Sequence, residues 1–153
     1  MHDRLKKIYF RLLAPVVVGF MALYPFRQVY PTIALPERHM AIVAPAIFIL
    51  AAVFAIAGPI FYRSLFSHRH CHLVKVSLLV LYQFERNLIG MALVTPYLAL
   101  VGYVLQLPSF HLAGTLLMAL YAVYYYYPFE ERIRFDGKLF RTGDLMSVNR
   151  IRG

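Results

Sequence analysis

The segment SHRHCH, residues 67–72, gathers the side chains best suited to binding a metal ion. In a helix, His68, Cys71 and His72 would share one face, because residues three and four positions apart are neighbours there. In an extended loop, His68, His70 and His72 would share one side instead. Imidazole and thiolate ligands suit zinc or copper, but a closed site needs a fourth ligand, and none lies near in the sequence. A plain basic loop is therefore the favoured interpretation, with the metal site as the alternative.

A second polar group precedes a long apolar run, and it consists of Tyr82, Gln83, Glu85, Arg86 and Asn87. At the mouth of a set of membrane helices these side chains could bind an anionic group. Burying both Glu85 and Arg86 in lipid would cost about 3 kcal/mol for each residue on insertion scales. Neighbouring residues on a helix point about 100° apart, so the pair cannot neutralise itself. The sequence therefore favours a position at the membrane boundary.

Other chemistry has weaker support in the sequence. The tyrosines at position 121 and at positions 124–127 could line a quinone pocket, but a run of this kind more often forms an interfacial belt. His39 and His111 have no partner within a span, which disfavours haem ligation. No phosphate-binding loop, HExxH or GxSxG pattern occurs. Glu85 is the one acid that a cation-coupled transporter could use, because no acid lies in the clean part of any span.

The composition points to a lipid environment for one domain. The chain has 153 residues, 61% of them hydrophobic, whereas water-soluble domains are about 45–50% apolar. The formal charge of +9 would suggest nucleic-acid binding in a soluble protein. Here the cations cluster at the ends of apolar segments, so membrane topology and anionic lipid headgroups explain them, and no nucleic-acid partner is expected. The single cysteine excludes an intramolecular disulfide.

Four segments approach the length of about 20 residues that a bilayer-spanning helix needs. They define an all-α, integral membrane four-helix bundle at residues 8–26, 40–61, 87–107 and 110–129. Residues 130–153 form a basic tail. The first span lacks a small-residue cleavage site after it, so we expect it to remain uncleaved.

The lysines and arginines set the orientation of these spans. Of the 16 in the chain, only Arg27 and Arg38 lie in the first and third connections. The positive-inside rule then places both termini and the middle loop in the cytoplasm, which fits an even number of spans. We expect residence in a membrane such as the bacterial inner (plasma) membrane. The tail cations expected to contact lipid headgroups are Arg132, Arg134, Lys138 and Arg141.

Three local features refine this arrangement. Residues 73–107 are too long for a single span, so residues 73–84 are expected to extend the third helix into the cytosol or along the membrane surface. This extension is apolar and needs a partner surface. Pro96, in the middle of the third span, should kink it. The tail segment RIRFDGKLFR carries an Asp-Gly turn signal and could form a short β-hairpin.

Two stretches resemble a known family, the membrane-associated proteins of eicosanoid and glutathione metabolism. FERNLIGMALVTPY is similar to the start of that family's second helix, and LYAVYYYYPFEER to the aromatic end of its third. The resemblance implies a small four-helix trimer that binds glutathione near the cytoplasmic face, with an enzymatic activity. The family's polar positions are filled here by Ile89, Leu93 and Pro96. The family's fourth helix would also be missing, and an extra helix would stand at the front.

These observations favour a small polytopic membrane protein that acts through helix association and has no enzymatic activity. It would serve as an accessory subunit of a membrane complex or as a small homo-oligomer. Its expected partners are membrane lipids and other membrane subunits or copies of itself, and the sequence indicates no particular cofactor. One alternative is a glutathione-type membrane enzyme, with Tyr82, Arg86 and Asn87 holding an anionic cofactor. The other is a small oligomeric transporter or channel that uses Glu85.

Overall fold

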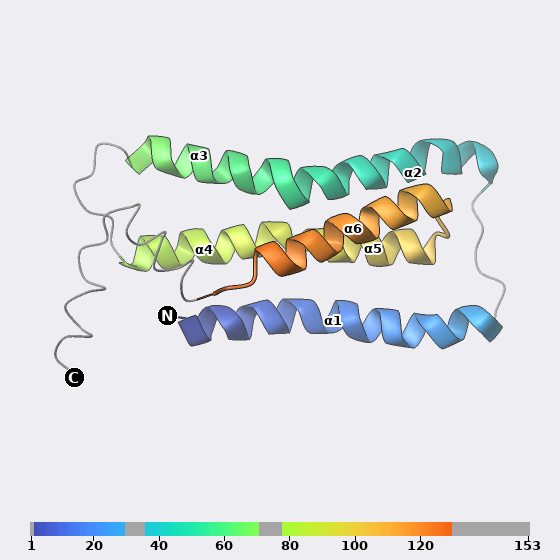
Figure 1. Ribbon diagram of the computed structural model, residues 1–153, viewed down its shortest axis with the longest axis horizontal. Coiled ribbons are helices and arrows are strands. Elements are labelled where there is room, and N and C mark those ends of the chain that lie inside the picture. The colour runs from blue at the N-terminus through green and yellow to red at the C-terminus, as the bar shows by residue number, and fades with distance from the viewer. Residues whose placement is uncertain (1, 30–35, 71–77, 130–153) are drawn as a thin grey trace.

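The computed structural model describes residues 2–29, 36–70 and 78–129, and 91% of these residues are helical (Figure 1). No strand occurs within these three ranges, which confirms the all-α prediction for them. The elements are α1 (His2–Val29), α2 (Glu37–Ala52), the π-helical turn η1 (Val53–Ala57), α3 (Gly58–His70), α4 (Leu78–Ala92), α5 (Val94–Val104) and α6 (Ser109–Tyr125).

The helices α2, η1 and α3 follow one another as a single rod with a bend. In the π-helical turn, the Gly58 N–H donates a hydrogen bond to the Val53 carbonyl. Pro59 has no N–H to donate to the Ala55 carbonyl one turn earlier. The wider turn accommodates this loss, and the rod changes direction at that point in Figure 1.

The helices α4 and α5 form a second rod, which is interrupted at Leu93. Pro96 cannot donate to the Ala92 carbonyl, so the ladder of helical hydrogen bonds is weakened just at that position. The Leu93 N–H still donates to the Ile89 carbonyl at 2.9 Å, which keeps the two helices nearly continuous. The expected effect of Pro96 therefore appears one turn before the proline itself.

A tight turn reverses the chain between α5 and α6. The Leu107 N–H donates to the Gly102 carbonyl at 3.1 Å, and the Gln106 N–H donates to the Tyr103 carbonyl at 3.3 Å. This pair of bonds is a Schellman motif, which requires a left-handed residue after the helix. Gln106 takes that conformation, with φ of 54°. Pro108 then begins α6, so α6 runs back antiparallel to α5.

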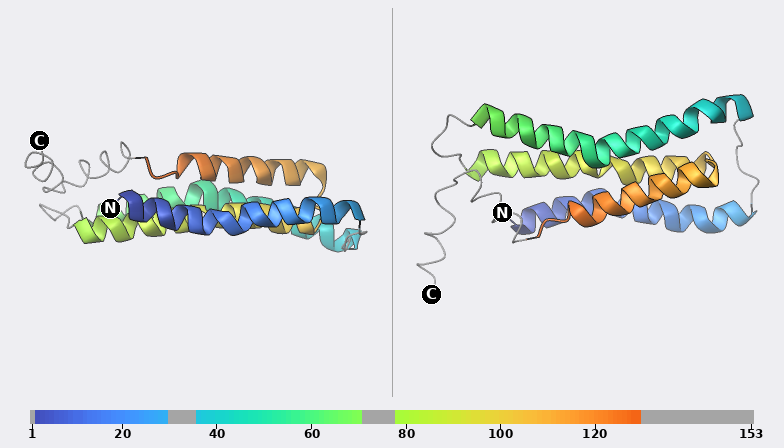
Figure 2. Two further views of the ribbon diagram at one scale, coloured as in Figure 1. Left: turned by 90° about the horizontal axis from the view of Figure 1, so that it is seen from below. Right: turned by 45° about the horizontal axis from the view of Figure 1, so that its top comes forward.

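The three rods lie side by side, and α6 covers one face of the layer that they form (Figure 2). The α4–α5 rod is central, with α1 on one side and α2–α3 on the other (Figure 1). Helix α6 packs on α5 and α2. Only 11% of the apolar window of α1 is buried, against 44% for α4–α5, so α1 is the least enclosed rod.

The core is divided into three small clusters along the layer. One cluster joins α3, α4 and α6, a second joins α1 to α4 and the end of α6, and the third joins α2 to the α5–α6 turn. Their buried members are Ala55, Phe66, Leu81, Phe84, Leu88, Ala92, Ala122 and Tyr126 in the first, Leu5, Tyr9, Ile89 and Leu93 in the second, and Ala44, Ile47 and Leu107 in the third.

Three helical segments are long and apolar enough to cross a membrane, namely Asp3–Pro25, Arg38–His68 and Leu79–Val104. The apolar helix α6 is shorter. The segment expected at 40–61 lies within the second, and the segment expected at 8–26 overlaps the first and runs one residue past its end. The third segment, expected at 87–107, begins earlier in the structure, where residues 78–86 belong to the helix, and it ends earlier, at Val104. The remainder of the extension, residues 73–77, and the hairpin in the tail lie outside the described residues.

The charged residues of the described helices lie toward the two ends of the layer. At one end, which we call the charged end, lie the start of α1, the end of α3 and the start of α4 (Figure 1). The opposite end, the far end, has two basic residues among the described ranges, Arg27 and Arg38. Between the ends, the described helices contain no Asp, Glu, Lys or Arg. The Lys and Arg residues on the helices at the charged end are Arg4, Lys6, Lys7, Arg11, Arg63, Arg69 and Arg86.

Candidate functional site

The five residues predicted to bind an anionic group fall on different sides of α4. Glu85 is buried, with 2% of its surface exposed, and Tyr82 is half-buried against the cluster beside α1. Gln83, Arg86 and Asn87 are exposed. The Asn87 amide donates a hydrogen bond to the Tyr62 hydroxyl of α3 at 3.2 Å. The set therefore divides into an inward carboxyl group and an outward polar group, which do not converge on one point.

Glu85 lies at the charged end of the molecule. Tyr97 on α5 donates a hydrogen bond of 2.6 Å from its hydroxyl to the Leu12 carbonyl on α1. The rods α1 and α4–α5 run in the same direction (Figure 1). Because Glu85 lies about 18 Å before Tyr97 along its rod, it is level with the first turn of α1, which carries Asp3 and Arg4.

Aromatic packing joins α4 to α3 at Phe84, the residue before Glu85. The Phe84 ring stacks on Tyr62 at 5.4 Å between ring centroids and packs against Phe66 at 4.2 Å. Between α1 and α6, the Tyr9 hydroxyl donates to the Val123 carbonyl at 2.7 Å. The Glu85 side chain itself is 2% exposed, and a buried carboxyl group is what a proton-carrying role would need.

The outward part of α4 forms a surface that we call the open face, made of the exposed Gln83, Arg86 and Asn87 and the half-buried Gly90. Gly90 distinguishes this surface from the rest of the molecule. A Cβ atom added at Gly90 would meet no atom within 4 Å, whereas the other described glycines are crowded by their own chain. The nearest atoms to such an added Cβ lie at 2.9 Å for Gly19, 2.8 Å for Gly58, 3.3 Å for Gly102 and 2.6 Å for Gly114.

The predicted metal ligands are mostly outside the described part of the chain. His68 is exposed in the last turns of α3, and the side chain of His70 is not described. Cys71 and His72 lie beyond the end of that helix, outside the described residues. In the ranges that the structure describes, no three His, Cys, Asp or Glu side chains are grouped closely enough to hold a metal ion. The predicted lipid-binding cations of the tail, from Arg132 to Arg141, are likewise outside these ranges.

The tyrosine run is split between the surface and the core. Tyr124 and Tyr125 are 77% and 48% exposed, and Tyr125 stacks on Tyr121 at 5.3 Å. Tyr126 is only 3% exposed and belongs to the cluster with α3 and α4. Tyr127 packs edge-on against Tyr9 at 5.3 Å. The run therefore supplies surface aromatics at its start and core contacts at its end.

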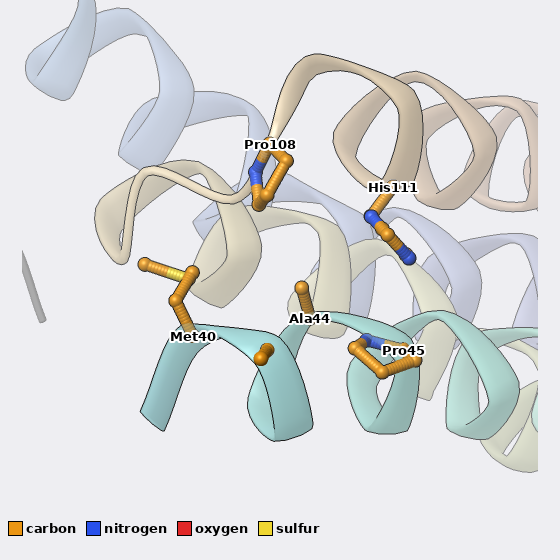
Figure 3. Close-up of a pocket in the computed structure, with 6 residues that line it drawn as sticks. Met40, Ala44, Pro45, Pro108 and His111 are labelled. Carbon is orange, nitrogen blue, oxygen red and sulfur yellow. The ribbon is translucent and has the colours of Figure 1, made fainter. Parts of the chain in front are cut away.

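A pocket of about 330 Å³ lies between α2 and the start of α6, near the far end. Sequence reasoning missed it because His111 had no partner along its own span, and its position opposite Pro45 depends on the α5–α6 turn. The available signal was a proline at the start of one helix, Pro108, followed three residues later by a histidine, with a second proline, Pro45, inside another helix. We call it the His111 pocket, and its lining residues are Met40, Ala41, Ala44, Pro45, Pro108 and His111 (Figure 3).

No family model, curated protein or solved structure matches this chain. Its function is therefore argued from its own residues.

Proposed function

We propose that this chain is an integral membrane protein with four spans and both termini in the cytoplasm, and that it acts by associating with another membrane chain or with copies of itself. The association surface is the open face of α4. The observation that carries this proposal is the unoccupied space over Gly90, on a helix whose other faces are packed.

Membrane residence is supported by where the apolar side chains lie. Three helical segments have the length and composition of spans. Large apolar side chains on their outer surfaces are exposed, among them Met21 at 74% and Ile42 at 71%. In water such surfaces would be costly, whereas lipid tails solvate them. Helix α6 is about 25 Å long, slightly short of a bilayer core of about 30 Å. Local thinning of the bilayer accommodates such a mismatch at modest cost.

The orientation is supported by the two ends of the layer. The parallel packing of α1 with α4–α5 brings their basic starts together with the basic end of α3. Cationic residues near the ends of spans favour the cytoplasmic side. The charged end is therefore cytoplasmic in this proposal, and the far end with Arg38 is external.

Gly90 is the reason for assigning association to α4. A glycine within a helix costs about 1 kcal/mol relative to alanine, so its presence calls for a compensating contact. The other four described glycines have such a compensating contact within this chain, because a Cβ atom there would lie 3.3 Å or less from a neighbouring atom. Gly90 has no such contact among the described residues. Helices in membranes approach closely where a small residue removes the side chain, so we assign the missing contact to a helix of another molecule.

The polar side chains of the open face fit the same role. Gln83, Arg86 and Asn87 lie within two turns of Gly90 and remain exposed. At the cytoplasmic boundary they can form hydrogen bonds across a helix interface, which specify a partner more than they add affinity.

Disulfide crosslinking in native membranes tests the proposal. Cys71 is the only cysteine, so Cys71→Ser gives a background without thiols. In that background, Gln83→Cys, which leaves Gly90 in place on the same face, should crosslink under mild oxidation. Leu120→Cys, at a 67% exposed position on α6, is the matched control. A band at twice the monomer mass would identify a homo-oligomer, and a band of another mass an accessory subunit with a cysteine within reach. Crosslinking no stronger at position 83 than at position 120 would contradict the assignment of the surface.

Transport is the second candidate, and the burial of Glu85 favours it. An enclosed carboxyl group at the charged end could exchange protons between the cytoplasm and the helix interior. Protein reconstituted into liposomes should then show pH-dependent flux that Glu85→Gln abolishes. Flux that is absent, or that persists in the variant, would remove this candidate and leave association.

A further inference from the structure

The His111 pocket is a slot between two helices with ring-bearing walls. Pro108 and His111 form the wall from α6, and Ala44 and Pro45 form the wall from α2 (Figure 3). The volume of about 330 Å³ is at the lower end of the range for small-molecule sites, which suits a single ring with small substituents. The shape therefore selects a flat head group of modest size.

The chemistry of the lining selects a neutral ligand with a hydrogen-bonding atom. The lining residues include no Lys, Arg, Asp or Glu, so a phosphate or carboxylate would lose its hydration without gaining a counter-charge. His111 is the single lining residue with a polar side chain. Its Nδ1 atom is buried and has no hydrogen-bond partner among the described residues. Such an atom gains from a ligand oxygen within hydrogen-bonding distance.

The imidazole is held in place by its neighbours. The Phe48 ring meets it edge-on at 6.4 Å, and the Phe110 ring meets it edge-on at 5.5 Å. The carbonyl of His111 accepts a hydrogen bond from the Thr115 hydroxyl at 2.7 Å, which fixes the helix turn beneath it. A side chain positioned in this way can bind a ligand with little loss of conformational freedom.

The pocket opens on a surface that faces lipid in the proposed arrangement. Ala41 lines the pocket and is exposed, and the neighbouring Ile42 is 71% exposed. A ligand can therefore enter sideways from the membrane, with its apolar tail remaining among lipid chains along α2. This route admits a molecule dissolved in the bilayer.

We propose that the His111 pocket binds the head ring of an isoprenoid quinone, with the imidazole of His111 hydrogen-bonded to a ring oxygen. A quinone is neutral and flat, carries oxygens on its ring, and has a long apolar tail. An imidazole suits both redox forms, because it donates to the carbonyl oxygen of the quinone and accepts from the hydroxyl group of the quinol. Only binding is assigned to this site.

The first test is binding of decylubiquinone, oxidised and reduced, to the full chain in quinone-free lipid nanodiscs. We expect saturable binding of one molecule per chain. Ala41→Leu should fill the slot and weaken binding at least tenfold. Ala46→Leu makes the same change at an exposed position on the same helix that does not line the pocket, and it should leave binding unchanged. Equal binding to both variants would show only partitioning into lipid and would overturn the proposal.

The second test separates the imidazole from the apolar walls. His111→Phe keeps a ring but removes the nitrogen atoms, and loss of one hydrogen bond corresponds to about three- to tenfold weaker binding. His111→Gln retains a hydrogen-bonding group and should recover part of that loss. Binding of n-decanol with the same sensitivity to Ala41→Leu would indicate a plain alkyl groove and would also overturn the proposal. Circular dichroism confirms that each variant is folded.

Discussion

Replacement of Gly90 by alanine should change the stability of the isolated chain and its association in opposite directions. Alanine favours a helix over glycine by about 1 kcal/mol. Because no atom of the described residues lies within 4 Å of the added Cβ, nothing in that part of the chain opposes the gain. The free energy of unfolding of the monomer should therefore rise by about 1 kcal/mol.

Gly114→Ala is the matched control, with the same chemical change at a crowded position. An added Cβ there would lie 2.6 Å from Cε2 and 3.1 Å from Cδ2 of the Phe48 ring. The ring must move, although it also packs against the imidazole of His111. Overpacking of this kind costs about 1–3 kcal/mol, which offsets or exceeds the propensity gain. The two variants should therefore differ in unfolding free energy by about 1–3 kcal/mol, with Gly90→Ala the more stable.

Association should show the reverse order. The methyl group of Gly90→Ala occupies the space that the proposed partner helix enters, so the complex should weaken by about tenfold, which corresponds to about 1.4 kcal/mol. Gly114→Ala lies away from the open face and should leave the affinity unchanged. Energy transfer between labelled chains in micelles reports a homo-oligomer, and co-purification reports a distinct partner. Unfolding of the dissociated chain is followed by circular dichroism in the same micelles.

Two results would refute this reasoning. A less stable Gly90→Ala monomer would mean that the space over Gly90 is filled within the chain. A stabilised monomer with unchanged association would mean that the open face faces lipid alone. The second result would contradict the proposed function but not the described fold.

Three further variants test how the helices are held. Tyr97→Phe removes the hydrogen bond to the Leu12 carbonyl and should lower the unfolding free energy by about 0.6 kcal/mol, with faster amide exchange in α1. Gln106→Gly relieves the left-handed backbone at φ of 54° and should raise the melting temperature, by a gain of up to about 1 kcal/mol. Phe84→Ala should cost about 3 kcal/mol in chemical denaturation, because the ring is 1% exposed, whereas Phe110→Ala, at 79% exposure, should cost far less.

The sequence predicts the helices better than it predicts how they bend. Apolar run lengths locate three helices long enough to cross a membrane, because a bilayer requires about 20 residues of a spanning helix. Pro96 predicts a kink, and the helix is interrupted at Leu93, next to the Ala92 carbonyl that lacks its hydrogen bond from residue 96. The π-helical turn before Pro59 was not expected. Its position depends on how the helix accommodates the hydrogen bond that Pro59 cannot form, and tertiary packing determines which accommodation is adopted.

The candidate site was predictable in its residues and not in its arrangement. The polar residues around Glu85 were identified from the sequence alone. Their division into a buried carboxyl group and an exposed Gln83, Arg86 and Asn87 depends on which faces of α4 meet α1 and α3, and one sequence does not determine this. The open space over Gly90 could not be predicted either, because the sequence does not show whether a glycine packs against another helix of the same chain.

The position of α1 has a consequence for how the protein is made. Of the described helices, α1 is synthesised before the others, but it packs chiefly on α4 and α5, which follow after the whole of α2–α3. The delay amounts to about 75 residues, on the order of 4–15 s of translation. In the proposed membrane arrangement, α1 stays in lipid without these neighbours during that time, and its largely unburied apolar surface is compatible with that. Packing of these helices is then completed when α4 and α5 join a helix that was made earlier.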